Sequence, residues 1–240
     1  MEQHYDRYTT EDQKVWETLY ERQIEQISES ASEAYLEGLQ ICNFNNVIPK
    51  ISELNEILFS ATGWKIEIVP GLIDNHSFFK LLSEKKFPAS TWLRKWASLD
   101  YLEEPDMFHD IFGHTPLLTN KDFCNFLEAL ANTALKFIED ENSIELISRV
   151  YWYSVEFGLI KEGEQLKIYG AGILSSRSES HYSLHAEEPL RVPFSVGEIL
   201  ETPYIKDKFQ EKYFIIDSYK NLFDSINDLE FLLSSKFSSK

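Results

Sequence analysis

The chain has 240 residues, of which 43% are hydrophobic and 26% are charged, and this composition predicts a globular fold with a sizeable core. A formal net charge of −17 repels phosphate backbones and anionic lipid surfaces, so it argues against nucleic-acid binding and membrane binding. The 17 Phe, 12 Tyr and 5 Trp must pack in a core or line a pocket, because large rings are costly to expose, and they favour small-molecule chemistry.

At the start of the chain, residues 1–7 are polar and charged where a secretory signal needs an apolar run. No stretch of about 18 apolar residues offers a membrane span, so we expect a cytoplasmic location. Cys42 and Cys124 lie far apart and outside any Cys-x-x-Cys pattern. We therefore expect two buried thiols rather than a disulfide or a thiolate zinc site.

The first predicted elements are helical. Thr9 or Thr10 is a capping residue followed by acidic side chains, and apolar residues then recur at helical spacing up to Leu39, which predicts one or two amphipathic helices. Residues 51–58 repeat apolar groups at the same spacing, and Gly63 predicts the end of this helix. Residues 64–69 alternate in the manner of a half-buried strand, which Pro70 ends.

The middle of the chain continues with helices. One is predicted through Phe78, ahead of Pro88. Another starts near Pro105, because proline fits the first helical turn and an acidic residue such as Asp106 is stabilised near a helix N-terminus. His109 therefore lies on this helix, and His114 lies on it or at its end.

The remaining elements complete a predominantly helical pattern. Residues 122–138 and 143–160 are predicted to be helical, and the second helix carries Glu156. Short strands at 165–169 and 213–216 are separated by a long irregular region, and a last helix covers 218–233 before a frayed end from Ser234. Without internal repeats or low-complexity linkers, residues 1–240 predict a single α+β domain that is mostly helical.

His109, His114 and Glu156 are the candidate metal ligands. Two imidazoles and one carboxylate form the ligand set of a non-haem iron(II) centre that leaves positions free for oxygen and other reactants. Glu156 lies among apolar residues, and a buried carboxylate needs a cation, either a metal or a buried Arg or Lys. The histidines are five residues apart, roughly 140° around a regular α-helix, so their spacing alone is a weak signal. Gly113 could end or distort the helix and bring the rings together.

A rival metal pair has better helical spacing. His181 and His185 are four residues apart and have Glu179, Glu187 and Glu188 nearby. The serine-rich residues before His181 and a proline after Glu188 instead predict a solvated loop.

Two other function classes stay open on the residues alone. A zinc hydrolase can use His109, His114 and Glu156 with water in the fourth position. A non-catalytic domain that binds an aromatic ligand would use the same three residues only for structure. Metal dependence and oxygen uptake separate these classes from an oxygenase.

Three long blocks carry a resemblance to a known family: Pro105-Asp-x-x-His-Asp-x-x-Gly-His-x-Pro-Leu-Leu118, Tyr151-Trp-x-x-Val-Glu-Phe-Gly-Leu159 and Tyr169-Gly-Ala-Gly-Ile-Leu-Ser-Ser176. They resemble the signature blocks of the tetrahydropterin-dependent aromatic amino acid hydroxylases, with further matches over residues 64–223. The chain is most similar to the compact bacterial phenylalanine-hydroxylating members, because it is too short for the regulatory and tetramerisation segments of animal enzymes. The resemblance implies the hydroxylase fold and a monomer that hydroxylates an aromatic L-amino acid, foremost L-phenylalanine to L-tyrosine, with O2, Fe(II) and a tetrahydropterin.

The resemblance also implies roles for single residues. Three match the iron ligands: His109, His114 and Glu156. Arg94 matches the arginine that grips the substrate carboxylate and Asp106 the acid that holds it, while Ser175 matches a hydroxyl that orients His109. The implied substrate-binding residues are Arg94, Asp106, Pro105, Trp152, Phe157, Ser175 and Ser176. The implied pterin-binding residues are Ile73, through its main chain, Phe78, by ring stacking, and Glu104, directly or through water.

Two residues bear on the choice of amino acid. At the position of Trp152, this sequence resembles phenylalanine and tyrosine hydroxylases, whereas tryptophan hydroxylases usually carry Phe at the matching position. Lys206 falls where phenylalanine hydroxylases tend to have an apolar residue and tyrosine hydroxylases an acid. Tyrosine and tryptophan therefore stay open as alternative substrates.

Overall fold

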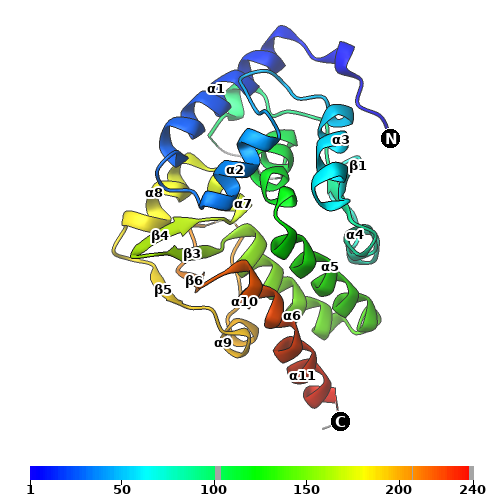
Figure 1. Cartoon of the computed structure of the whole chain (residues 1–240), viewed down its shortest axis with the longest axis vertical. Coiled ribbons are helices and arrows are strands. Elements are labelled where there is room, and N and C mark those ends of the chain that lie inside the picture. Colours follow the sequence, from blue (N-terminus) through cyan, green and yellow to red (C-terminus); the bar gives the residue numbers. More distant parts are fainter. Residues whose placement is uncertain (101–103, 207, 238–240) are drawn as a thin grey trace.

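The computed structural model describes residues 1–100, 104–206 and 208–237. Helices make up most of the fold, and a small sheet lies to one side of them (Figure 1). The α-helices are α1 (Thr10–Ile27), α2 (Glu33–Ile41), α3 (Ile51–Thr62), α4 (Asn75–Ser83), α5 (Lys121–Lys136), α6 (Glu141–Tyr151), α7 (Ala171–Leu174), α8 (Arg177–His185), α9 (Val196–Glu201), α10 (Tyr219–Asp224) and α11 (Ile226–Phe237). The strands are β1 (Lys65–Ile68), β2 (Lys86–Ala89), β3 (Leu159–Glu162), β4 (Gln165–Ile168), β5 (Leu190–Pro193) and β6 (Lys212–Ile216). The predicted α+β class with a helical majority is confirmed.

The strands form two sheets. The larger has the order β4-β3-β6-β5, in which β3 is antiparallel to β4 and parallel to β6, and β5 is parallel to β6. Gly163 supplies the positive φ of 62° in the turn between β3 and β4. The smaller sheet is the parallel pair β1 and β2, with Ile66 opposite Phe87.

The helix boundaries follow local side-chain chemistry. The Thr9 hydroxyl accepts a hydrogen bond from the Asp12 N–H, and the Asp12 carboxylate accepts one from the Thr9 N–H, so α1 begins with a capping box as predicted. Gly63 ends α3 with a φ of 80°, which a residue with a side chain adopts only at a cost. Asp74 caps α4 by accepting from the Ser77 N–H.

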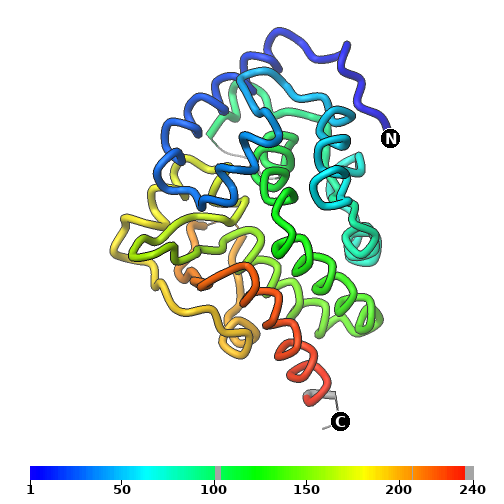
Figure 2. The backbone as a smooth tube through the Cα atoms, in the orientation of Figure 1, coloured from blue at the N-terminus to red at the C-terminus, as the bar shows by residue number. Residues whose placement is uncertain are grey.

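The core is rich in aromatic rings. All but one of the largest fully buried side chains are aromatic: Trp16, Trp64, Tyr35, Tyr169, Tyr213, Phe79, Phe108, Phe112, Phe123, Phe126, Phe214 and Ile27. The buried residues form one continuous cluster from Val15 in α1 to Leu233 in α11. Helix α5 crosses the middle of the molecule and packs against α4 and α10 (Figure 2). Cys42 and Cys124 are buried free thiols, as predicted.

Helix α2 lies very close to a short 3-10 helix, η4 (Thr115–Thr119). A Cβ atom added to Gly38 of α2 would lie 2.1 Å from the Pro116 carbonyl oxygen. This contact fixes the N-terminal helices against the segment that follows His114. Among the helices in the described part of the chain, none has the length and apolar character needed to cross a bilayer.

Several predicted boundaries are wrong. The helix expected over 143–160 is α-helical only to Tyr151 in α6 and then continues as a π-helix to Glu156, whereas Leu159 and Ile160 belong to β3, since their apolar side chains pack in the sheet. The region expected to be irregular contains α7, α8, β5 and α9. The last helix is divided at Ser225 into α10 and α11, and α11 continues beyond Ser234. Strand β2, which includes Pro88, was not predicted.

Candidate active site

His109 and His114 lie on a π-helix, η3 (Phe108–His114). Backbone hydrogen bonds of a π-helix join residues five apart, so such residues follow one another on the same face. The Nε2 atoms of the two histidines are accordingly 3.2 Å apart. The helix does not end at Gly113, but its winding over Phe108–His114 departs from that of an α-helix, so the expected distortion is present. Gly113 continues the π-helix and lies against Ala171.

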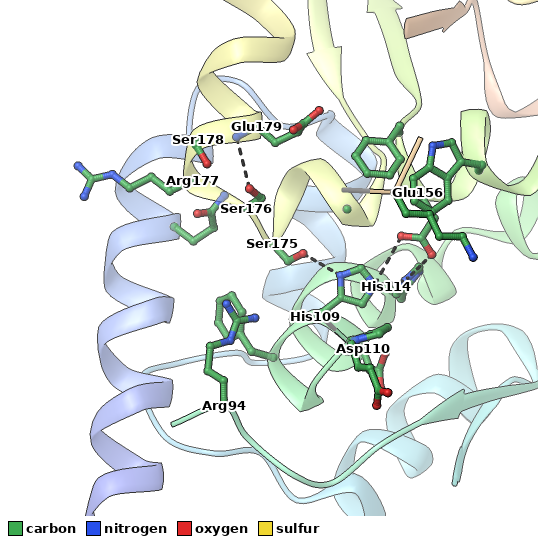
Figure 3. Close-up of a pocket in the computed structure, with 18 of the residues that line it drawn as sticks. Arg94, His109, Asp110, His114, Glu156, Ser175, Ser176, Arg177, Ser178 and Glu179 are labelled. Atoms are coloured by element: carbon green, nitrogen blue, oxygen red, sulfur yellow. Dashed lines mark hydrogen bonds and ion pairs between the residues drawn. The ribbon is translucent and has the colours of Figure 1, made fainter. Parts of the chain in front are cut away.

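Glu156 comes from a second π-helix, η5 (Trp152–Glu156), which continues α6. The Phe157 N–H donates to the Trp152 carbonyl, five residues earlier, at 2.9 Å. The two carboxylate oxygens of Glu156 lie 3.2 Å from His114 Nε2 and 3.5 Å from His109 Nε2 (Figure 3). The three residues therefore converge, as the sequence suggested.

The geometry of the three donors fits a metal ion. Among the described residues, these three are the only group of three or more His, Cys, Asp or Glu side chains whose ligand atoms converge, all within 4.8 Å. Ligand atoms about 2.1 Å from a metal and about 90° apart are about 3 Å from each other, close to the spacings found here. Two histidines and one carboxylate on one face are the facial set of non-haem iron(II), with the opposite positions open.

Ser175 sets the tautomer of His109. Its hydroxyl donates its single hydrogen to the Ala171 carbonyl at 2.8 Å, so at 2.9 Å it must accept from His109 Nδ1. With the proton on Nδ1, the lone pair of His109 Nε2 faces His114 and Glu156 (Figure 3). This orientation is the one that a metal ligand requires.

Burial and charge hold these groups in ligand form. Burial lowers the pKa of His109 to about 4, although Glu156 opposes this, so the imidazole is neutral at pH 7. Burial raises the pKa of Glu156, but the neighbouring His114 and His109 outweigh it and hold the pKa below its ordinary value. In the described part of the chain, the ion-pair partners of Glu156 are these imidazoles rather than an Arg or Lys.

Arg94 and Asp106 form a buried ion pair beside the histidines. The Nε and Nη2 groups of Arg94 each donate to one Asp106 oxygen at 2.9 Å, and Nη1 donates to the Leu99 carbonyl. Asp106 is completely buried and also accepts from the His109 N–H at 3.1 Å. Burial alone would raise the pKa of Asp106, but the hydrogen bonds and charge of Arg94 have the larger combined effect. The pKa of Asp106 is therefore held below its ordinary value. Arg94 is thereby held at the cavity wall.

One cavity of about 2060 Å³ brings together all the predicted site residues except Asp106, which lies behind Arg94. Those lining it are Ile73, Phe78, Arg94, Glu104, Pro105, His109, His114, Trp152, Glu156, Phe157, Ser175 and Ser176. Ser176 also caps α8 by accepting from the Glu179 N–H (Figure 3). This volume exceeds that of a single amino acid and leaves room for a second ligand.

Aromatic rings form two walls of the cavity. Trp152 stacks on Tyr204 and lies tilted by 34° against Phe157, with ring centroids 4.7 Å apart in both pairs. Phe78 is half-buried and meets Tyr151 edge to face at 5.3 Å. Flat ligands are suited to such walls.

Sequence reasoning missed several residues of the cavity. Asp110 lines it next to His109 and accepts from the Ser90 N–H at 2.7 Å, and burial raises its pKa to about 7. Asp110 lies in the Pro105–Leu118 block beside His109, and this position was the signal that could have identified it. Tyr204 stacks on Trp152, whose indole N–H donates to Gln210, and no local pattern links residues so far apart in the chain.

The rival histidine pair lies on α8, not on a loop. His181 and His185 are exposed, and their ring centroids are 5.1 Å apart. In the residues that the structure describes, no third ligand joins them. This pair therefore lacks the convergence found at His109.

Comparisons with known proteins agree with this geometry. The model of the biopterin-dependent aromatic amino acid hydroxylase family matches residues 4–240. Phenylalanine-4-hydroxylase of Chromobacterium violaceum is 47% identical over 221 residues, 92% of this chain and 74% of the relative. The Pseudomonas aeruginosa enzyme of that name is 41% identical over 217 residues, 90% and 82% of the two chains. A crystal structure of the Chromobacterium violaceum enzyme with iron(III) and 7,8-dihydrobiopterin superposes with a TM-score of 0.93 at 45% identity, covering 98% of this chain and 86% of that chain.

Proposed function

Because this chain belongs to the biopterin-dependent aromatic amino acid hydroxylase family, we propose that it converts L-phenylalanine to L-tyrosine. It is an iron-dependent and pterin-dependent monooxygenase. The observation that carries the proposal is the convergence of His109, His114 and Glu156 at the wall of a cavity that also presents Arg94.

The three convergent residues would hold the iron. His109 and His114 would bind it through Nε2, and Glu156 through a carboxylate oxygen, while Ser175 keeps the His109 proton on Nδ1. Iron(II) and the reduced pterin, when bound, supply the electrons that activate dioxygen. The protein contributes orientation of the reactants and exclusion of water.

Arg94 would bind the carboxylate of the amino acid. Its guanidinium is held by Asp106, and the forked donors of an arginine suit a carboxylate ligand. The ring of the substrate would then lie against Pro105, Trp152 and Phe157, with one edge toward the histidines. Ser175 and Ser176 would close this side of the pocket.

The pterin would lie on the other side of the metal site. The half-buried Phe78 offers a ring for stacking, and Ile73, which precedes α4, lines the cavity and would bond the pterin through its main chain. Glu104 is exposed at the cavity and would bond the pterin directly or through water. Two flat ligands would share the one cavity.

An activity assay tests the proposal. Iron-loaded protein is incubated with a tetrahydropterin, oxygen and phenylalanine, tyrosine or tryptophan, and the hydroxylated products are quantified. Formation of tyrosine from phenylalanine at the highest kcat/KM is the expected result, and the absence of any hydroxylated product would refute it. Bound zinc in place of iron in the purified protein, together with no oxygen uptake, would favour a hydrolase.

The matched variant is Glu156→Gln, which keeps the shape of the side chain but loses its charge. It should lower the bound iron well below one per chain without altering the far-UV circular dichroism spectrum. Full iron occupancy in this variant would exclude Glu156 as a required ligand.

The same proposal treats residues 1–240 as one catalytic unit, which the continuous core from Val15 to Leu233 supports. A monomeric state and a cytoplasmic location stay predictions from the sequence. Light scattering and cell fractionation test them.

A further inference from the structure

The side chain of Gln210 joins the aromatic wall of the cavity to the segment between α9 and β6. Its Oε1 accepts a hydrogen bond from the Trp152 indole N–H at 2.9 Å. Its Nε2 donates to the carbonyls of Ile205 and Lys208 at 3.0 and 3.3 Å. A flipped amide would turn its N–H groups toward the indole N–H, so these bonds fix the orientation of the amide.

The backbone of Gln210 is also anchored. Its N–H donates to the Glu179 carboxylate at 3.3 Å, and the same oxygen accepts from the Tyr213 hydroxyl. All three residues are buried, with 3%, 5% and 0% of their surfaces exposed. Glu179 belongs to α8 and Tyr213 to β6, so the carboxylate that anchors the Gln210 backbone is itself bonded to a second regular element.

Trp152 depends on this anchor for its orientation. The stacked ring of Tyr204 and the tilted ring of Phe157 still allow the indole to rotate or slide in its own plane, because offset ring contacts tolerate a range of positions. A hydrogen bond is directional and restricts that rotation. Gln210 provides this bond.

The same side chain holds part of the cavity rim. Residues 202–211 contain neither helix nor strand in the part that is described, and Tyr204, Lys206 and Phe209 of this segment line the cavity. The two carbonyls that Gln210 binds lie on either side of Lys206. Rim and aromatic wall are thus coupled through one amide.

We propose that Gln210 is a positioning residue for substrate selectivity, which fixes the Trp152 indole and the rim segment so that the pocket accepts a phenyl ring in preference to larger rings. This proposal rests on the proposed function. Gln210 acts through Trp152 and is not a ligand of the substrate or the metal.

The test uses Gln210→Met, which preserves side-chain length and removes the hydrogen bonds. In a 1H–15N spectrum, the indole resonance that disappears in Trp152→Phe belongs to Trp152, and it should move upfield in Gln210→Met. The KM for phenylalanine should rise about three- to tenfold, as expected for one net hydrogen bond, and the preference for phenylalanine over tryptophan in kcat/KM should fall by a similar factor. Bound iron should equal that of the wild type.

Gln3→Met is the matched control. Gln3 is a half-buried glutamine outside the cavity lining, and its amide donates to the Pro49 carbonyl at 3.0 Å and accepts from the Ile51 N–H at 2.9 Å. It should leave the Trp152 resonance and the substrate preference unchanged. In the Trp152→Phe background, Gln210→Met should alter the KM by a smaller factor than in the wild type, since the indole bond is already absent and only the bonds to the Ile205 and Lys208 carbonyls are lost.

An unshifted Trp152 resonance, an unchanged preference, or a full additional effect in the Trp152→Phe background would overturn the proposal. If Gln210→Met does not fold, Gln210→Asn, whose amide is one methylene too short to span both contacts, gives the same readouts. A wild-type protein that hydroxylates none of the three amino acids refutes the proposed function, whereas the resonance still decides whether Gln210 positions Trp152.

Discussion

Replacing Arg94 with alanine should lower the stability of the fold and, independently, weaken substrate binding. Arg94 is 8% exposed and Asp106 is completely buried, and the guanidinium makes two hydrogen bonds to this carboxylate. In Arg94→Ala, the Asp106 carboxylate retains only backbone donors, the N–H groups of residue 94 and His109. A buried charge is then left without its cation.

The cost is about 3–5 kcal/mol, the usual range when one partner of a buried ion pair is removed. For a chain of this size, each kcal/mol corresponds to about 2–4 °C in the melting temperature, so a fall of about 6–20 °C is expected. Thermal unfolding followed by circular dichroism measures it. The KM for phenylalanine should also rise at least tenfold, because a charge-assisted anchor of the substrate is lost.

A double variant distinguishes the two effects. Arg94→Met with Asp106→Asn removes both charges and keeps an oxygen for the His109 N–H, so most of the lost stability should return while the KM stays high. A single variant that melts within 2 °C of the wild type (about 1 kcal/mol or less) would refute the structural reasoning. Recovery of the wild-type KM in the double variant would refute substrate binding by Arg94.

Three further predictions follow from single contacts. Ser175→Ala frees Nδ1 of His109 and should weaken iron binding about 10–100-fold in an anaerobic titration; equal affinity would contradict the tautomer argument. Gly38→Ala places a Cβ 2.1 Å from the Pro116 oxygen and should cost at least about 1–3 kcal/mol in urea unfolding, whereas Gly197→Ala, with nothing within 4 Å, should cost nothing. Burial raises the pKa of Glu179 despite its bonds to Tyr213 and Gln210, so the folded state favours the protonated acid. As pH rises above about 4.3, the free energy of unfolding of the wild type should therefore fall relative to that of Glu179→Gln. A difference between the two proteins that does not change with pH would exclude a raised pKa for Glu179.

The three candidate metal ligands could be predicted from sequence because each lies in a long, distinctive block. Their convergence could not be derived from spacing, since a five-residue interval faces one way on an α-helix and another on the π-helix that His109 and His114 share. The winding depends on tertiary packing, including the contact of Gly113 with Ala171. The resemblance supplied what the weak five-residue spacing could not.

Errors in the predicted helices and strands have similar causes. Helix α8 is mostly polar and partly exposed, so it lacks the apolar periodicity that identified α5. The continuous apolar run that includes Leu159 fits either a helix or a buried strand, and only pairing with β6 decides between them. Gln210 and Trp152 are 58 residues apart, so their bond leaves no trace in any local window.

The two π-helices also limit how this centre can be transferred to other proteins. Grafting a histidine pair with the spacing of His109 and His114 onto an ideal α-helical bundle would direct the rings to different faces. Deleting one residue from Phe108–His114 would allow ordinary winding and turn one imidazole away from the carboxylate. A designer would have to transplant the irregular winding together with the neighbours that enforce it, and the transferable unit is therefore the backbone with its packing rather than the three ligands.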